Sequence, residues 1–354
     1  MPEIVLDRSL TIFIATALTL TASYAGSALA MNSNALLDDP NHRSSHDHAV
    51  SRAGGVAMLA ASIAGLFILA AFLAGDAFSS PAFQFLALGA LAAGLGLADD
   101  HLDLHALVKL AGQVLIAALF VLWVGPLETA SLPVIGFADL GYAGALVTVF
   151  WIVAFMNAFN FMDGVNGIAG GAALVGLGIF APVAALTGAG DAAAIALVIA
   201  AAAAGFLPAN VLRGRLFMGD SGSHFLAFMI AGLAVYAANA SDGAANPFLL
   251  PTIFLPFIVD VAFTLAHRIM RGENVLAAHR DHIYQLVLRR GASHATVAAI
   301  YAGVIAFSAA VSIFMLTLPP AWMWLAPASL TALLTVIALR IYAGAKSAGM
   351  IEQR

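Results

Sequence analysis

Long apolar runs separated by short polar breaks make up most of this 354-residue sequence. A helix needs about 20 apolar residues to cross roughly 30 Å of hydrocarbon, and the runs repeat at about this length. They predict eleven membrane spans, with ten as the alternative count, at residues 9–30, 54–75, 82–98, 106–125, 141–161, 168–187, 191–209, 221–240, 248–267, 296–317 and 321–343. We therefore expect an all-α, polytopic membrane bundle, formed as a single domain over residues 1–354.

The polar connections between these runs differ in charge from one side to the other. If the N-terminus lies outside, one side receives the C-terminal tail and the loops 31–53, 99–105, 162–167, 210–220 and 268–295. Of the 14 Lys and Arg residues, all but Arg8 lie in these segments or at span ends beside them. The positive-inside rule makes that side cytoplasmic. The sequence thus predicts a bacterial inner-membrane protein with a periplasmic N-terminus and a cytoplasmic C-terminus.

Composition narrows the chemistry further. Hydrophobic residues make up 62% of the chain and charged residues only 9%, which leaves little sequence for a soluble domain. There is no cysteine, so disulfides, thiolate metal sites and a cysteine nucleophile are excluded.

Three acidic residues follow the third apolar run. Asp99, Asp100 and Asp103 lie where this span meets the cytoplasm, and on a continuing helix Asp103 would share a face with both of the others. A solvated loop at the membrane boundary would explain one acid, but three raise one another's pKa unless a cation lies nearby. We favour a functional site, because acidic residues at membrane depth are costly.

The segment NAFNFMDGVNG ends the fifth run on the same side. It places Asn157, Asn160, Asp163 and Asn166 at threefold spacing, which predicts a row of polar side chains on one helix face. Such a row suits oxygen ligation and hydrogen bonding. The alternative is a helix C-cap, in which Asn and Gly only satisfy the last carbonyl groups.

The segment GRLFMGDSGS places Asp220 between glycines just before the eighth run. Backbone amides at a helix N-terminus can bind phosphate, and the carboxylate could hold a metal ion. The alternative is an ordinary N-cap by Asp220 or Ser221, since Asp and Ser are favoured capping residues.

Basic residues gather in two loops on this side. The segment RGENVLAAHRDHIYQLVLRRG contains Arg280 and His282, and could receive a nucleotide diphosphate; an amphipathic helix at the lipid headgroups is the alternative. The first loop contains Arg43, His46 and Arg52 and could bind a phosphate group beside the bilayer. For Asp260, inside the ninth run, we expect a structural hydrogen bond rather than a catalytic role.

Five segments occur in a characteristic order: PN-x-R-S-S-H with R-x-GG, ADDHLDL, NAFNFMDGVNG, FMGDSGS and HRDHIYQ. Together they resemble the polyprenyl-phosphate N-acetylhexosamine-1-phosphate transferase family. This family includes bacterial transferases that initiate O-antigen and wall polymers, and the phospho-MurNAc-pentapeptide translocase.

The resemblance implies an enzyme in which undecaprenyl phosphate attacks the β-phosphorus of a UDP-sugar and UMP leaves. It implies Mg²⁺ as cofactor, and Mn²⁺ would also fit oxygen ligands. Carried over by motif, the expected roles are catalysis for Asp99, Asp100 and Asp163; metal binding for Asp220 and Asn160; donor binding for Asn157, Asn166, His279, Arg280 and His282; and acceptor-phosphate binding for Arg43, His46 and Arg52.

The sequence departs from the family pattern at two places. Asn166 stands where many members have a second Asp, and Tyr284 and Gln285 stand where many have consecutive histidines. The second departure resembles the O-antigen branch, which implies a UDP-N-acetyl-6-deoxyhexosamine as donor, with UDP-N-acetylglucosamine still open.

The expected partners are a UDP-sugar, undecaprenyl phosphate and membrane lipid, with no nucleic acid, and the chain could form a homodimer. Two other functions remain open. One is the phospho-MurNAc-pentapeptide transferase of peptidoglycan synthesis. The other is an ion-coupled transporter, which would place its acidic residues near the bilayer midplane rather than at one face.

Overall fold

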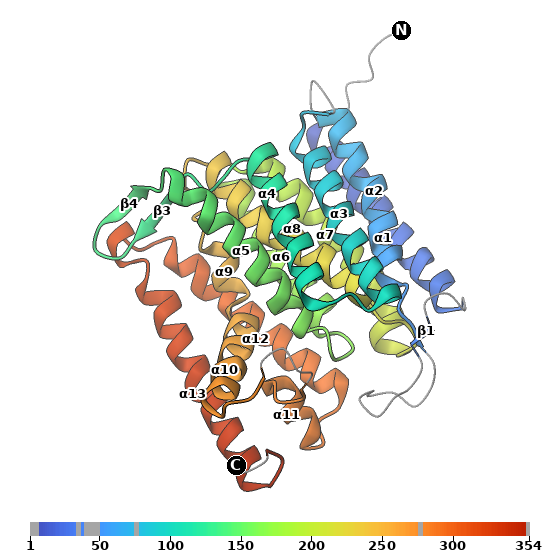
Figure 1. Cartoon of the computed structure of the whole chain (residues 1–354). Helices are drawn as coiled ribbons and strands as arrows, with labels where there is room; N and C mark the ends of the chain where they lie inside the picture. The colour runs from blue at the N-terminus through green and yellow to red at the C-terminus, as the bar shows by residue number, and fades with distance from the viewer. Residues whose placement is uncertain (1–6, 33–36, 39–49, 74–77, 275–278, 352–354) are drawn as a thin grey trace.

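The computed structural model describes residues 7–32, 37–38, 50–73, 78–274 and 279–351. Its long helices pack side by side, and α11 and the C-terminus lie at the lower end of the bundle in Figure 1. The α-helices are α1 Arg8–Met31, α2 Gly54–Leu73, α3 Pro81–Leu102, α4 Ala106–Trp123, α5 Tyr142–Phe161, α6 Ile168–Leu186, α7 Gly190–Leu207, α8 Gly219–Ala240, α9 Leu249–Ile253, α10 Leu255–Met270, α11 Ile283–Arg289, α12 His294–Met315 and α13 Leu325–Ser347. A π-helical turn, Pro208–Leu212, continues α7, and a 3₁₀ turn, Pro320–Trp322, precedes α13.

Within the described residues, ten helical segments are long and apolar enough to cross a membrane. The predicted span at 248–267 is not one helix, because the chain breaks at Phe254 between α9 and α10. Pro251 and Pro256 lie on either side of this break, and neither can donate a backbone hydrogen bond within a helix. The protein is a multi-pass helical membrane protein whose ninth apolar run is divided into a short and a longer helix.

Short strands add two small hairpins to the helical fold. Strand β1, Leu37–Asp38, pairs with β2, Val50–Ser51, and β3, Thr129–Leu132, pairs with β4, Gly136–Asp139. Ser51 also accepts a hydrogen bond of 2.8 Å from the amide of Phe217, just before α8. The β3–β4 hairpin lies at the upper left in Figure 1, whereas β1 lies toward the lower end. The first loop is thus tied to the start of α8.

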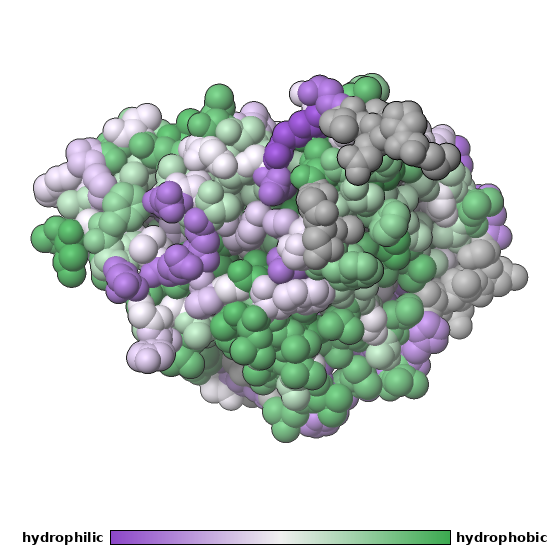
Figure 2. Space-filling view, turned by 90° about the horizontal axis from the view of Figure 1, so that it is seen from above, coloured by the Kyte–Doolittle hydropathy of each residue, from purple (hydrophilic) through white to green (hydrophobic). Residues whose placement is uncertain are grey.

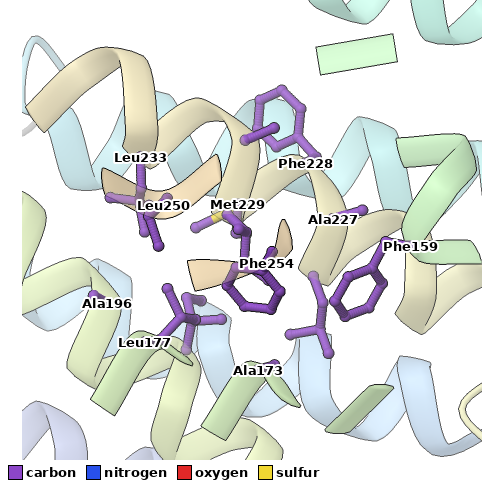
Figure 3. Close-up of a cluster of buried hydrophobic side chains, with 14 of the residues drawn as sticks. Phe159, Ala173, Leu177, Ala196, Ala227, Phe228, Met229, Leu233, Leu250 and Phe254 are labelled. Carbon is purple, nitrogen blue, oxygen red and sulfur yellow. The ribbon is translucent and has the colours of Figure 1, made fainter. Parts of the chain in front are cut away.

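Helix α8 lies at the centre of the bundle. In its most apolar stretch 94% of the residues are buried. Its Met229 and Leu233 lie among side chains from α6 and α9 (Figure 3), whereas its Phe228 ring packs against phenylalanine rings of α3 and α4. Helix α2 crosses α8 at very short range, because a Cβ on Gly55 would lie 2.2 Å from the amide nitrogen of Gly222. Small residues let membrane helices approach in this way. This packing fixes the N-terminal end of α8, where Asp220 lies.

Figure 2 shows the bundle from above relative to Figure 1, and so shows the end away from α11 and the C-terminus. Hydrophilic side chains form a band across this face, and hydrophobic side chains occupy much of its rim. Such a distribution is expected where the ends of membrane-spanning helices meet water and their sides meet lipid.

Candidate active site

Carboxylates from two distant segments meet around one lysine. Lys109, in the first turn of α4, donates to Asp99 Oδ2 at the end of α3 and, at 3.2 Å, to Asp220 Oδ2 at the start of α8. The Asp99 side chain is 10% exposed and that of Asp220 is 30% exposed. An ammonium group between two largely buried carboxylates compensates their charges where water is limited. The structure therefore brings the predicted Asp99 and Asp220 segments together at one end of the bundle.

Asp100 caps the helix that carries Asp220. Its two carboxylate oxygens accept hydrogen bonds of 3.1 Å from the backbone amides of Asp220 and Ser221. This close approach is possible because residue 96 is glycine, where a Cβ would lie 2.1 Å from the Asp220 carbonyl oxygen. A carboxylate here accepts hydrogen bonds from amides that have no partner within the helix, and its negative charge interacts favourably with the positive end of the helix dipole. The alternative of capping by Asp220 or Ser221 themselves does not describe this helix start.

Asn160 reaches Asp220 from α5. Its amide nitrogen donates to Asp220 Oδ1 at 3.0 Å and to Ser223 Oγ at 2.8 Å. In this arrangement Asn160 orients the Asp220 carboxylate. Because Lys109 contacts the other carboxylate oxygen, both oxygens of Asp220 are held by neighbouring helices.

The predicted row of polar residues on one helix face is wrong in its second half. Helix α5 ends at Phe161, so Asp163 and Asn166 lie in the turn before α6, whose N-cap Gly167 has a φ of 88°. The backbone leaves the helix there because Asp163 and the residues after it form a turn that leads to a left-handed glycine. Asn157 and Asn160 remain on α5.

Asp163 lies close enough to the other acids to interact with them. Burial is the main cause that raises the pKa of this carboxyl well above its usual range, and the charges of Asp220 and Asp100 raise the pKa further. No hydrogen bond or ion pair to its carboxylate is found among the described residues. The raised pKa favours the protonated form of this carboxyl, and an added cation would favour the charged form.

Asp103 does not join the cluster. The helix that contains Asp99 ends at Leu102, and Asp103 is an exposed C-cap residue with a left-handed φ of 48°. The expectation of a continuing helix with three acids on a shared face is therefore wrong. In its place the backbone amide of Leu104 donates to Asp99 Oδ1 at 3.0 Å, which fixes that carboxylate.

The described residues contain no group of three or more His, Asp or Glu side chains arranged to hold a metal ion. Asp99 and Asp220, which both contact Lys109, offer carboxylate oxygens at one place. Mg²⁺ commonly uses one or two carboxylates and completes its coordination with water and substrate phosphates. The donor set therefore fits a metal that arrives with a phosphate-bearing substrate.

Comparison with known proteins bears on this arrangement. A model of glycosyl transferase family 4 matches residues 82–238, which include Asp99, Asp163 and Asp220. Decaprenyl-phosphate N-acetylglucosaminephosphotransferase of Mycobacterium tuberculosis H37Rv is 33% identical over 304 residues, covering 78% of this chain and 75% of the relative. The chain belongs to glycosyl transferase family 4.

Two further relatives of this family 4 member come from other bacteria. A probable undecaprenyl-phosphate N-acetylglucosaminyl 1-phosphate transferase of Bacillus subtilis 168 is 31% identical, over 73% of this chain and 71% of the relative. The undecaprenyl-phosphate alpha-N-acetylglucosaminyl 1-phosphate transferase of Escherichia coli K12 is 26% identical, over 72% of this chain and 70% of the relative.

The HRDHIYQ segment of the family 4 chain is anchored by Asp260. This carboxylate accepts hydrogen bonds from the amides of Ile283 and Tyr284, at 2.9 and 3.1 Å, and from the Tyr301 hydroxyl at 2.5 Å. His282 Nδ1 lies 3.2 Å from it, and the His282 side chain is only 3% exposed. The expected structural hydrogen bond of Asp260 is confirmed. His282 lies at the start of α11, mostly removed from solvent.

Tyr284 connects this segment to the turn that carries Asp163. Its hydroxyl donates to the Phe161 carbonyl at 3.1 Å, and a Cβ on Gly164 would lie 2.1 Å from the same hydroxyl oxygen. Tyr284 therefore fills the space against the turn, and glycine at position 164 admits it.

The remaining basic residues that the sequence assigns to substrate binding are not all found at the acidic cluster. Arg280 is exposed, and the His279 ring lies tilted beside that of His282, with centroids 4.9 Å apart. Arg52 lies 3.9 Å from Asp100 Oδ1, at the edge of the acidic cluster. Arg43 and His46 lie outside the described residues.

Several site residues escaped the sequence interpretation. Gln113 and His224 are buried beside the cluster, and Ser223 receives the hydrogen bond from Asn160. In the sequence, Lys109 is only one of the basic residues at the span ends. A signal was present, because Lys109 and Gln113 are four residues apart within one apolar run, and Asp220 and His224 are four residues apart at the start of another. Polar pairs with helical spacing inside a membrane span identify the helix face that points into the protein.

Proposed function

We propose that this family 4 chain transfers a sugar 1-phosphate from a UDP-activated N-acetylhexosamine to undecaprenyl phosphate, releases UMP, and so initiates a lipid-linked cell-surface glycan. The observation that carries the proposal is the contact of Lys109 with Asp99 and Asp220 at one end of the bundle. The printed names of the relatives, which act on decaprenyl or undecaprenyl phosphate, support the acceptor class and make N-acetylglucosamine the first donor to test.

The charge balance of the site favours a divalent cation. Asp99, Asp100 and Asp220 supply three carboxylates, and the positive charges beside them are Lys109 and, at longer range, Arg52. Two phosphate-bearing substrates add further negative charge, and phosphoryl transfer depends on its neutralisation. We infer that Mg²⁺ is held by Asp220 with Asp99 nearby; when bound it neutralises the donor diphosphate. Mn²⁺ would serve the same oxygen ligands.

The protein's own groups would then divide the remaining work. Lys109 holds Asp99 beside Asp220, and Asp99 orients the acceptor phosphate or removes its proton. Asp100 keeps the amide end of α8 in place, and Asn160 turns the Asp220 carboxylate toward the reactants. Asp163, with its raised pKa, can donate a hydrogen bond to the nucleotide.

The placement of this site at one end of the bundle supports the enzyme over the ion-coupled transporter. In a transporter, polar residues that bind the ion are expected near the bilayer midplane. Here Asp99 and Asp100 lie in the last turn of α3, and Asp220 lies in the first turn of α8.

The decisive experiment measures UMP release by purified protein in lipid. UDP-N-acetylglucosamine, UDP-N-acetylgalactosamine and two UDP-N-acetyl-6-deoxyhexosamines are each supplied with and without undecaprenyl phosphate and Mg²⁺. We expect UMP and a lipid-linked sugar only when both substrates and the metal are present, and loss of both in Asp220→Asn. Asp103→Asn is the matched control, because Asp103 is exposed at the same end and Asn tolerates its left-handed backbone. A folded protein that releases no UMP from any donor refutes the proposal.

We further propose that the site faces the cytoplasm of a bacterial inner membrane, with the N-terminus periplasmic and the C-terminus cytoplasmic. The gathering of Lys and Arg on the site side of the sequence supports this orientation. Because the chain has no cysteine, single cysteines at Leu102 and Val134, both strongly exposed, can report the two faces. A membrane-impermeant maleimide added to intact spheroplasts should label position 134 and spare position 102; the reverse pattern refutes this orientation.

A further inference from the structure

Three hydrogen-bonded polar side chains, two of them buried, lie one helical turn beneath the acidic site. His224 is fully buried on α8, and Gln113 is 1% exposed on α4. The two side chains meet with His224 Nε2 and Gln113 Nε2 3.1 Å apart. The other end of Gln113 accepts a 2.6 Å hydrogen bond from the amide nitrogen of Asn157 on α5. Asn157 is half-buried, and burying His224 and Gln113 within a membrane bundle is costly unless both are satisfied.

The hydrogen bonds among these side chains can run in only one direction. Asn157 donates to the carbonyl of Val153 at 2.8 Å, and a carbonyl only accepts, so the Asn157 nitrogen faces Gln113 as a donor. Gln113 must then present its oxygen to Asn157 and its nitrogen to His224. His224 Nε2 is therefore an acceptor without a proton.

The other ring nitrogen is fixed by the same logic. His224 Nδ1 lies 2.8 Å from the carbonyl oxygen of Asp220, which again only accepts, so Nδ1 must carry the proton. The ring is thus neutral, with its proton on Nδ1. The three side chains Asn157, Gln113 and His224 are called the relay below. A backbone carbonyl at each end, Val153 and Asp220, fixes the direction of its hydrogen bonds.

Each member of the relay lies one turn from a member of the site above it. Asn157 precedes Asn160 on α5, Gln113 follows Lys109 on α4, and His224 follows Asp220 on α8. One turn of helix is about 5.4 Å. The same three helices are therefore joined twice, first by the contacts of Asp220 with Lys109 and Asn160, and then by the relay.

We propose that His224 is a positioning residue, whose neutral imidazole joins α8 to α4 and thereby holds Asp220 in contact with Lys109. The effect on catalysis rests on the proposed function, whereas the effect on the contact does not. His224 touches no reacting atom in this scheme. Without its acceptor nitrogen, the Gln113 amide would be left buried and unpaired, and α4 would lose its deep connection to α8.

Two variants of similar shape separate the two hydrogen bonds of His224, the one to Gln113 and the one to the Asp220 carbonyl. In His224→Gln, the side-chain oxygen can take the place of Nε2 and accept from Gln113, so the link between helices is kept. In His224→Asn, the shorter amide can replace only Nδ1, so the local bond to the Asp220 carbonyl is kept and the link is lost. His224→Leu removes both. The relay predicts that Gln rescues and Asn does not.

The kinetic test uses these three variants with UDP-N-acetylglucosamine, or whichever donor proves active. Per folded molecule, we expect kcat to fall about 10-fold or more in the Leu and Asn variants, as for residues that orient metal-site groups. The Gln variant should stay within about threefold of wild type. Equal kcat in the Asn and Gln variants would overturn the proposal, as would unchanged kcat in the Leu variant.

Two measurements need no activity, so they test the relay even if the proposed reaction is wrong. The ¹⁵N spectrum of imidazole-labelled protein in lipid, assigned by difference with His224→Gln, should show a neutral ring protonated on Nδ1. A ring protonated on Nε2, or on both nitrogens, would overturn the relay. Thermal unfolding of His224→Leu, Lys109→Met and the double variant should be non-additive, because both changes weaken one α4–α8 connection. Additive shifts would show that His224 does not support the Lys109 contact.

Discussion

Lys109→Met is the substitution whose effect can best be worked out from the structure. At the 3.2 Å separation of Lys109 Nζ and Asp220 Oδ2, the attraction is about 5 kcal/mol at an effective dielectric constant of about 20. Asp99 adds a second contact, and both carboxylates would be left facing each other without compensation. The cost of moving the lysine out of water offsets part of this attraction. Because the three side chains are 24%, 10% and 30% exposed, we expect a net loss of about 2–4 kcal/mol.

The assay is thermal unfolding of purified protein in lipid, with Lys346→Met as the matched control. Lys346 is the only other lysine of the chain, and it is exposed near the end of α13. We expect a lower unfolding temperature for Lys109→Met and no shift for the control. Asp99→Asn added to Lys109→Met should recover part of the loss, because it removes one of the unpaired charges. Added Mg²⁺ should raise the unfolding temperature of Lys109→Met more than that of wild type, since the two carboxylates are then free to bind it.

Two results would refute this reasoning. If Lys109→Met is as stable as Lys346→Met, the bridge does not carry the cost assigned to it. If Asp99→Asn lowers the stability of Lys109→Met further, repulsion between the carboxylates is not the source of the loss.

Three further predictions follow from single contacts. Asp100→Ala should destabilise the fold by about 1–2 kcal/mol through loss of the α8 cap, and Asp100→Asn by less because one acceptor oxygen remains; chemical unfolding in lipid can compare them. Gly164→Ala should reduce activity and stability, because the added Cβ meets the Tyr284 hydroxyl. Gly171→Ala is the control, since nothing lies within contact of a Cβ there. Adding Tyr284→Phe to Gly164→Ala should partly restore both the unfolding temperature and the turnover rate. Burial, followed by nearby positive charge, lowers the pKa of His279 to about 4. The folded state should therefore lose stability as the pH falls from about 6.5 toward 4. His279→Gln should flatten that part of the plot of stability against pH, and an unchanged plot would contradict the shift.

The positions of the helices could be predicted closely from the sequence, because lipid imposes one strong constraint on apolar length. The run predicted at 54–75 is a helix at Gly54–Leu73, and that at 168–187 is a helix at Ile168–Leu186. The break at Phe254 was missed because hydropathy does not register a change of helix axis. Pro251 and Pro256, five residues apart, were the available signal.

The site could be predicted only as a set of segments. Acids at helix ends predicted that Asp99 and Asp220 would meet, and their contacts with Lys109 confirm that they do. The partners of each acid depend on how helices pack, and no periodicity within one helix contains that information. Asp100 was therefore not foreseen as the cap of α8, nor His224 as a link to α4. The roles of the individual residues in the reaction stay predictions until the variants are measured.

The central position of α8 has a consequence for how the protein is made. Of the ten candidate spans in the described part of the chain, α8 is the least apolar and by far the most buried. A helix that gains little from lipid inserts less readily by itself, and its polar face needs protein neighbours. We expect α8 to enter the membrane late, alongside helices already inserted by the ribosome-bound translocon. The catalytic end would then form only once that assembly is complete, so truncated chains ending before α9 should be targets of membrane proteases.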